Sequence, residues 1–240
     1  MYWSLGLALC LIVALEVLPR ESYAQTPSYR VLAFSRTTGF RHDSIPEAIA
    51  AVQQLGQANG FAVDATEDPS RFEDTTLAGY QAVIFLLTTG DVLDAAGRAA
   101  FERYIRAGGG YVGVHSAADT EYDWSFYGEL LGAYFASHPE IQTAALSGLP
   151  DPWLRTDEWY NFRRNPRPSV QVLLQLDEGS YTGGEMGEDH PITWYHAYEG
   201  GRAWYTGMGH TRESYTEPLF LRHLLAGIQY AAGVIGSPET

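Results

Sequence analysis

The stretch Gly110-Tyr111-Val112-Gly113-Val114-His115-Ser116-Ala117 is the most informative part of the sequence. It runs an apolar strand directly into a tight turn, and enzymes built on parallel sheets often expose a nucleophile at such a junction. The turn carries His115, with Ser116 next to it, but the Gly-x-Ser-x-Gly pattern of a serine nucleophile is missing. A structural role, with Gly113 permitting close packing and His115 capping the next element, remains the alternative.

Strand and helix patterns alternate on both sides of this stretch. Buried strands are predicted by four apolar runs, at residues 30–35, 61–66, 82–87 and 111–115. Helices are predicted between them at 45–59, with Ser44 as the cap and Gly60 as the end, and at 94–107. This order predicts an α/β fold with a parallel sheet and helices on its faces.

The second half of the chain has a looser pattern. It predicts a short helix at 124–131, a strand at 170–176, a hairpin formed by 192–198 and 202–208, and a closing helix at 218–232. Residues 139–165 are predicted to be a mostly irregular but ordered loop, because a loop of this length is usually functional when it is rich in aromatic and charged residues. The 240 residues contain no visible repeat, which favours one domain over residues 25–240.

The first 24 residues are interpreted as a secretory signal peptide. An apolar run from Leu5 to Leu18 precedes Ser22-Tyr23-Ala24, which has the small residues of a cleavage site. No Lys or Arg precedes the run, so a retained membrane anchor is the competing interpretation, although the run is shorter than the roughly 20 residues of a spanning helix. The prediction is a secreted or periplasmic protein.

Charge and cysteine content narrow the chemistry. The formal net charge of −14 disfavours nucleic acid and, once the signal is removed, anionic membranes as partners. Cys10, the single cysteine, lies in the predicted signal peptide. The mature chain would then have neither a disulfide nor a thiolate, so its chemistry must rely on histidines, carboxylates and hydroxyls.

Histidines gather where the predicted strands end. His196 and His223 fall inside predicted elements, whereas five others lie at strand ends or in loops: His42, His115, His138, His190 and His210. Ligands of such sheets bind beyond the carboxyl ends of the strands. Histidines near carboxylates act as acid–base groups or metal ligands, so a divalent metal is a candidate cofactor, with His42, His115, His138 and His210 as candidate ligands. No pair has the i, i+4 spacing of a specific zinc motif.

Seven ordered motifs give the sequence a family resemblance. They are Phe40-Arg41-His42-Asp43-Ser44-Ile45, Thr88-Thr89-Gly90, residues 109–115, Ser137-His138-Pro139, Asp157-Glu158-Trp159-Tyr160, Asp189-His190-Pro191-Ile192 and Gly207-Met208-Gly209-His210-Thr211. Together they resemble the trehalose-utilisation (ThuA-like) domain family over residues 30–233. The resemblance implies a flavodoxin-like three-layer sandwich of the class I glutamine amidotransferase type, with a mostly parallel central sheet.

The resemblance also implies a direction for function. The wider superfamily usually has a cysteine nucleophile after the fourth strand, and His115 matches that position, so amidotransferase chemistry is not expected here. The family is associated with sugar catabolism and accompanies sugar dehydrogenases, which implies action on oxidised (keto) glycosides. The sequence departs from the family pattern at residues 140–152, where less chain separates two motifs and an edge strand is expected to be missing or remodelled.

The leading hypothesis is an exported enzyme that hydrolyses, eliminates or isomerises a sugar or modified glycoside. Its proposed catalytic residues are His115, His42, Asp157 and Glu158. A polar and aromatic lining for a carbohydrate-type small molecule is predicted from Thr89, Asp119, Trp124, Tyr160, His138, His190 and His210. Two alternatives remain: a non-catalytic carbohydrate-binding domain on the same fold, and a hydrolase that uses Ser116. The oligomeric state is open.

Overall fold

The computed structural model describes residues 27–149 and 151–238. The predicted signal peptide lies outside these residues. The described residues form one large sheet of nine strands, in the order β2-β1-β3-β4-β11-β10-β9-β6-β7. A separate two-stranded sheet pairs β5 (Phe135–Ser137) with β8 (Asn161–Phe162). The chain therefore has an α/β fold built around one mixed sheet.

Half of the large sheet is parallel and half is antiparallel. The parallel strands are β2 (Ala62–Thr66), β1 (Arg30–Phe34), β3 (Ala82–Leu86), β4 (Gly110–Val114) and β11 (Gly201–Thr206). The antiparallel extension consists of β10 (His190–Tyr198), β9 (Gln171–Asp177), β6 (Gln142–Ser147) and β7 (Trp153–Asp157). The expected parallel strands are confirmed, but the sheet as a whole is more mixed than the sequence indicates.

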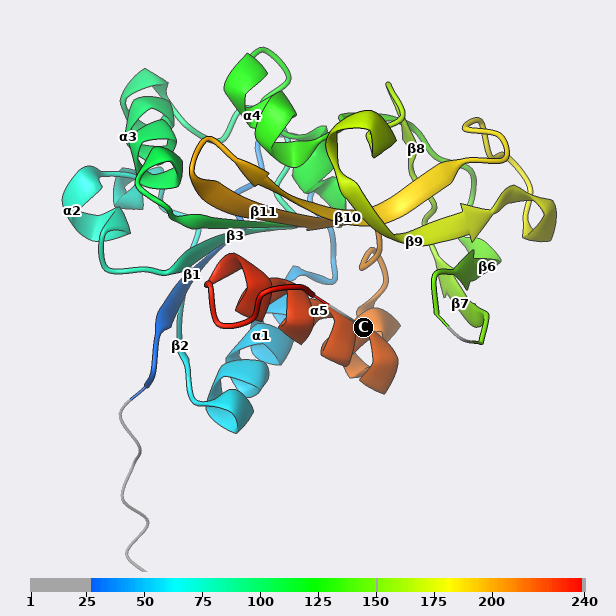
Figure 1. Cartoon of the computed structure of the whole chain (residues 1–240), viewed down its shortest axis with the longest axis horizontal. Coiled ribbons are helices and arrows are strands. Elements are labelled where there is room, and N and C mark those ends of the chain that lie inside the picture. Colours follow the sequence, from blue (N-terminus) through cyan, green and yellow to red (C-terminus); the bar gives the residue numbers. More distant parts are fainter. Residues whose placement is uncertain (1–26, 150, 239–240) are drawn as a thin grey trace, which may run out of the picture.

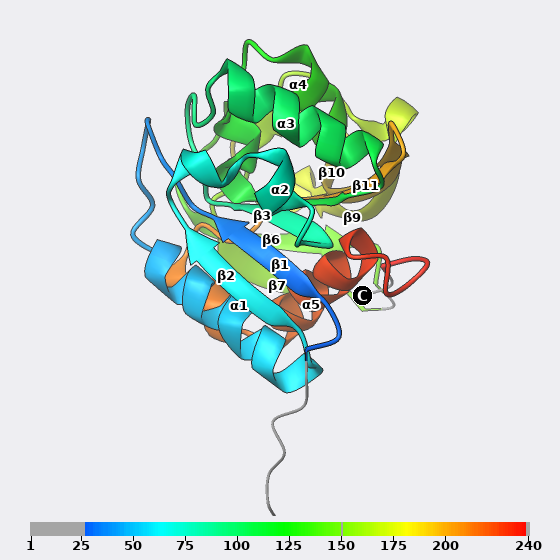
Figure 2. The same cartoon turned by 90° about the vertical axis from the view of Figure 1, so that its left-hand side faces the viewer.

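Helices lie on both sides of the sheet (Figures 1 and 2). One side carries α3 (Ala95–Arg106) and α4 (Ser125–Leu131), with α2 (Asp74–Leu77) packed beside α3. The opposite side carries α1 (Ile45–Asn59) and α5 (Pro218–Ala231). No helix within the described ranges has the length and apolar character needed to cross a membrane.

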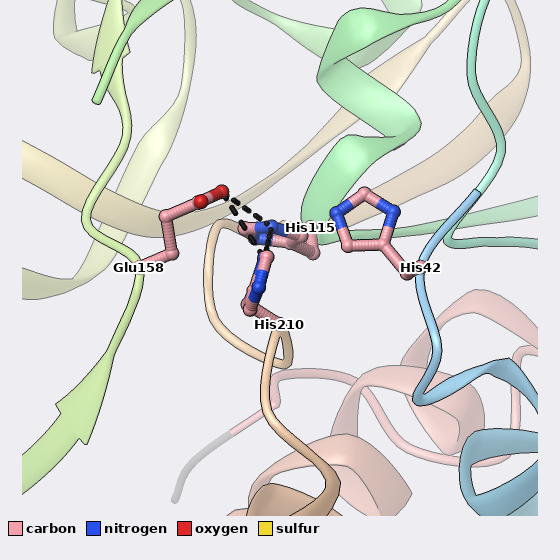
Figure 3. A group of neighbouring side chains, drawn as sticks. All are labelled: His42, His115, Glu158 and His210. Atoms are coloured by element: carbon pink, nitrogen blue, oxygen red, sulfur yellow. Dashed lines mark hydrogen bonds and ion pairs between the residues drawn. The ribbon is translucent and has the colours of Figure 1, made fainter. Parts of the chain in front are cut away.

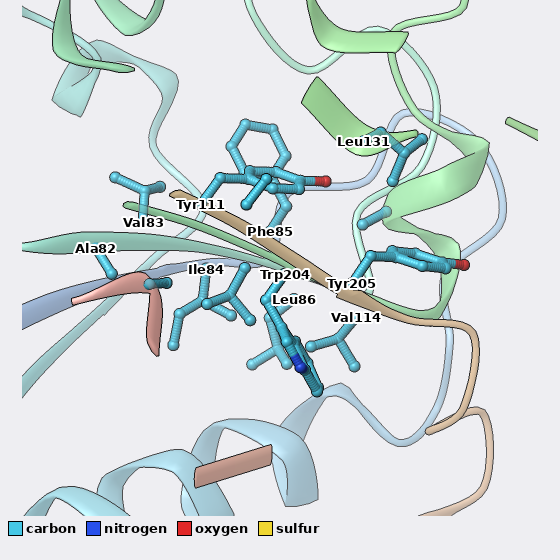
Figure 4. Close-up of a cluster of buried hydrophobic side chains, with 14 of the residues drawn as sticks. Ala82, Val83, Ile84, Phe85, Leu86, Tyr111, Val114, Leu131, Trp204 and Tyr205 are labelled. Atoms are coloured by element: carbon cyan, nitrogen blue, oxygen red, sulfur yellow. The ribbon is translucent and has the colours of Figure 1, made fainter. Parts of the chain in front are cut away.

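The core between these layers is aromatic and aliphatic (Figure 4). All five residues of β3 are fully buried, which matches the continuous apolar run expected of a central parallel strand. On one side of the sheet Tyr111 packs against Phe85, and its hydroxyl lies 2.9 Å from that of Tyr127. On the other side α5 approaches so closely that a Cβ on Gly227 would lie 2.3 Å from the ring of Trp204. These contacts fix the central strands and hence the ends that carry the candidate site.

Two expectations from the sequence are wrong. Residues 139–165 are not mostly irregular, because they contain β6, β7 and β8. In β7 buried and exposed residues alternate, with Trp153, Arg155 and Asp157 facing inward. Ser44 does not cap α1 with its side chain. Its hydroxyl instead donates to the carbonyl of His210 at 2.7 Å, which ties α1 to the loop after β11.

His223 on α5 is expected to make stability depend on pH. It is fully buried, and burial, reinforced by the charge of Arg155, lowers its pKa from 6.5 to about 3. Below pH 6.5 the unfolded chain binds a proton that the folded protein does not, so stability is lost as the pH falls toward 3. We expect His223→Gln to remove about 2 kcal/mol of the stability difference between pH 7 and pH 5. Urea unfolding of both proteins at the two pH values measures this difference. An equal change in the free energy of unfolding between pH 7 and pH 5 in both proteins would contradict the prediction.

Candidate metal centre

The turn after β4 holds His115 in an unusual conformation. Its φ of 51° lies in the left-handed region, which costs a non-glycine residue about 1–2 kcal/mol. The ring is fully buried, and its Nδ1 donates to the carbonyl of Gly207 at 2.8 Å. The main-chain carbonyl of His115 accepts a hydrogen bond from Tyr205. These contacts leave Nε2, which faces His210 and Glu158, as the acceptor nitrogen.

Four side chains from distant parts of the sequence converge at this point (Figure 3). His42, His115, Glu158 and His210 each offer one ligand atom, and these atoms all lie within 4.8 Å of one another. We call this group the His3Glu cluster. Three of its members follow parallel strands, β1, β4 and β11, whose carboxyl ends meet at one edge of the sheet. Glu158 follows β7 and reaches the same place from the antiparallel half.

The distances within the His3Glu cluster suit a divalent ion. His115 Nε2, His210 Nδ1 and Glu158 Oε2 form a triangle with sides between 3.1 and 3.3 Å. Ligands about 2.1 Å from a common ion and at tetrahedral or octahedral angles are about 3.0–3.4 Å apart. Two histidines and a carboxylate on one face are a common donor set for divalent transition metals, and His42 adds a fourth donor.

The electrostatics of the cluster act differently on its members. Burial, reinforced by the neighbouring His115 and His210, lowers the pKa of His42 to about 2, so its ring is neutral. Burial alone would raise the pKa of Glu158, but the neighbouring rings of His115 and His210 outweigh it and hold the pKa below its usual range. Neutral imidazole and ionised carboxylate are the forms that bind metal, so His42 and Glu158 are already in the required state. Burial alone would lower the pKa of His210, but the hydrogen bond and charge of Glu158 outweigh it and raise the pKa, so an ion would have to displace a proton from this ring.

Asp157 supports the cluster rather than joining it. Its carboxylate is fully buried and accepts hydrogen bonds from the backbone N–H groups of Gly209 and His210, at 2.8 and 3.0 Å, and of Glu158, at 3.0 Å. Arg155 is buried beside it, with an N–O distance of 3.1 Å. The carboxylate therefore fixes the backbone of two cluster residues. The structure favours a positioning role for Asp157 over the predicted catalytic one.

Two further predicted residues border the cluster. His138 is 41% exposed, and its Nδ1 lies 3.2 Å from Glu158 Oε1. The ring of Tyr160 is packed against that of His115, with centroids 4.1 Å apart. His138 thus stands where a ligand of the cluster would meet it, whereas Tyr160 is only 3% exposed and supports the ring of His115 from within.

Four predicted lining residues have other surroundings. Trp124 is a core residue that donates to Glu102. His190 is fully buried, with its ring nitrogens 2.8 Å from Glu178 and 2.9 Å from the carbonyl of Tyr160. Asp119 accepts a hydrogen bond from Tyr122. Thr89 is fully buried, and its hydroxyl donates to the carbonyl of Phe40. None of the four belongs to the cluster, and for Trp124 and His190 burial argues against substrate contact.

The structure gives Ser116 and Arg155 surroundings that the sequence does not indicate. Ser116 is fully buried, and its Oγ lies 3.4 Å from His42 Nδ1. This position suits the orientation of the His42 ring better than nucleophilic attack. The sequence does not mark Arg155, because its inward position depends on the alternation of buried and exposed residues in β7.

Comparison with known proteins gives a consistent picture. The model of the family described as trehalose utilisation (ThuA) matches residues 30–231. The fold resembles the crystal structure of a putative ThuA-like protein from Bacteroides uniformis, with a TM-score of 0.72 and 26% identity over 89% of this chain and 94% of that one. A putative ThuA-like protein from Parabacteroides merdae gives 0.71 and 21% over 86% and 90%, which is a likeness of fold. A search of curated proteins finds no match.

Proposed function

Because the chain belongs to the trehalose-utilisation (ThuA) family, we propose that it is a sugar-active enzyme whose chemistry depends on a divalent metal ion held by the His3Glu cluster. One observation carries the proposal: four donor atoms from four separate segments lie within 4.8 Å of one another. The family association and its link to oxidised sugars favour a sugar or keto glycoside as substrate. We also propose a flavodoxin-like three-layer sandwich, which the helices on both faces of the sheet support.

In this proposal the ion and the residues around it have different roles. A bound divalent ion supplies Lewis acidity, which polarises a carbonyl or lowers the pKa of water. His115 and His210 hold fixed donor atoms, because Gly207 orients the first ring and Asp157 holds the backbone of the second. His138 reaches Glu158 from the exposed side, so it is placed to hydrogen-bond a substrate hydroxyl or to exchange a proton with it. Hydrolysis, elimination and isomerisation are all compatible with these roles.

We also propose a cellular location and a class of partner for the protein. We propose an exported protein, secreted or periplasmic, on the signal-peptide pattern of residues 1–24. The net charge of −14 disfavours nucleic acid as a partner, so we propose a small molecule as the ligand.

A metal-dependence assay tests the proposed function. Purified protein is stripped with a chelator, reloaded with Zn²⁺, Mn²⁺, Fe²⁺, Co²⁺ or Ni²⁺, and incubated with trehalose, sucrose and their 3-keto derivatives. We expect turnover of at least one sugar, its loss of at least tenfold on stripping, and its recovery with one of the ions. Sugar binding without turnover under every condition would instead favour the non-catalytic carbohydrate-binding alternative. A folded protein that binds neither metal nor sugar would contradict both.

A further inference from the structure

Phe40 is an exposed aromatic residue beside the His3Glu cluster. Its side chain is 65% exposed, and only three other large hydrophobic residues of the described chain are comparably open. Its ring meets that of His42 edge to face, with centroids 4.9 Å apart and planes at 83°. One edge of Phe40 therefore touches a proposed metal ligand while most of the ring faces solvent. A ring in this place contributes little to the core and offers an apolar surface to a ligand.

The backbone under Phe40 is firmly held. The buried hydroxyl of Thr89 donates to the Phe40 carbonyl at 2.7 Å. Thr38 N–H donates to the Thr89 carbonyl at 2.9 Å, so the loop after β1 and the loop after β3 are bonded in both directions. Arg41, the next residue, forms a two-point ion pair with Glu67, at 2.7 and 3.1 Å. Phe40 is thus presented on a fixed support, which lowers the entropy cost of using it for binding.

The position of Phe40 complements that of His138. Figure 3 shows Glu158 and His42 on opposite sides of the cluster, with His115 and His210 between them. Phe40 contacts His42, and His138 contacts Glu158. One flank of the cluster therefore carries an apolar ring and the other carries a polar, partly exposed ring. The two rings thus lie beside opposite members of the cluster.

We propose that Phe40 is a specificity-determining residue that stacks on the apolar C–H face of a pyranose ring whose polar edge is directed toward the cluster. This inference rests on the proposed function and narrows its substrate class to sugars with a ring face free of axial hydroxyls. Such sugars combine an apolar face with a polar rim, which matches the two flanks of the cluster. In this arrangement Thr89 acts as a positioning residue through the Phe40 carbonyl, not as a substrate contact.

The test compares steady-state kinetics of metal-loaded variants on the trehalose, sucrose and 3-keto sugar panel. We expect Phe40→Ala to raise KM roughly tenfold and to change kcat less than twofold, because stacking is made equally in ground and transition states. Phe40→Trp should keep KM near the original value. Thr89→Val should raise KM to a smaller extent, and Thr89→Ser should restore it. Metal affinity, measured by calorimetry, should stay unchanged in Phe40→Ala.

Leu154→Ala is the matched control, since Leu154 is 68% exposed on the edge strand β7 and its removal should leave KM unchanged. If Phe40→Ala and Leu154→Ala both leave KM unchanged while the original protein turns over a sugar, the stacking role is overturned and the proposed function stands. If Phe40→Ala lowers metal affinity along with activity, Phe40 is only a support for His42, which also overturns the stacking role. If the original protein acts on no sugar, the proposed function fails, and this inference fails with it.

Discussion

Replacing His115 by alanine is expected to lower the affinity for a divalent ion at least about 100-fold and to abolish turnover. Loss of a supporting hydrogen bond alone typically costs roughly 10- to 100-fold in metal affinity, and loss of a ligand atom should cost at least as much. His115 Nε2 lies within 3.3 Å of donor atoms on both His210 and Glu158, so its removal opens the triangle on one side. Calorimetric titration of the stripped protein measures the affinity directly.

A second histidine variant distinguishes the loss of a metal ligand from the general effect of removing a histidine. His196 lies on β10 and donates from Nε2 to the carbonyl of Leu130, well outside the His3Glu cluster. His196→Gln should therefore bind the ion as the original protein does. An ion at 100 times its dissociation constant should also raise the stability of the original protein and of His196→Gln by about 2.7 kcal/mol, but not that of His115→Ala. Equal ion binding by all three proteins would show that the cluster is not a metal site.

Replacing Asp157 by alanine is expected to destabilise the protein by about 3–5 kcal/mol. The change leaves the buried guanidinium of Arg155 without its closest carboxylate, and it leaves the N–H groups of Gly209 and His210 without an acceptor. Each loss is costly, because a buried charge or donor without a partner keeps its full desolvation penalty. Urea denaturation of the metal-free protein measures the effect apart from any ion.

A double variant tests why Asp157→Ala loses stability. Arg155→Met removes the buried charge that Asp157→Ala leaves unpaired, so the double variant should be more stable than Asp157→Ala alone. The N–H groups would stay unsatisfied in both, so full recovery is not expected. Asp177→Asn, at an exposed turn where the side chain binds only Gly179 N–H, should change stability by less than about 1 kcal/mol. A loss in Asp157→Ala no larger than that of Asp177→Asn would contradict the positioning role.

The parallel half of the fold was predictable because its signals are local. The apolar run of β3 and the end of α1 at Gly60, which has a φ of 73°, each follow from a few neighbouring residues. Parallel strands place their carboxyl ends together, so the sequence could also anticipate that His42, His115 and His210 approach one another. The sequence does not reveal β6 and β7, because short strands near the edge of a sheet leave a weak pattern.

Side-chain surroundings were less predictable than strand positions. Nothing local distinguishes Asp157 from Glu158, yet the first faces the backbone of the loop after β11 and the second faces the cluster. His190 resembles the other loop histidines in sequence, but β10 begins at this residue and buries it. The sequence does not mark Phe40 as a binding residue, because exposure is a property of the folded surface. These distinctions depend on contacts between residues far apart in the chain.

The spread of the cluster along the sequence has a consequence for folding. Its four members extend from residue 42 to residue 210, so an ion held by them would act as a cross-link that closes several long loops at once. Cross-links of this kind reduce the entropy of the unfolded chain, which is the role usually assigned to disulfides in exported proteins. A chain whose only cysteine is Cys10 has no disulfide available for that purpose. Loss of the ion would therefore remove a stabilising cross-link of the fold together with the proposed metal centre.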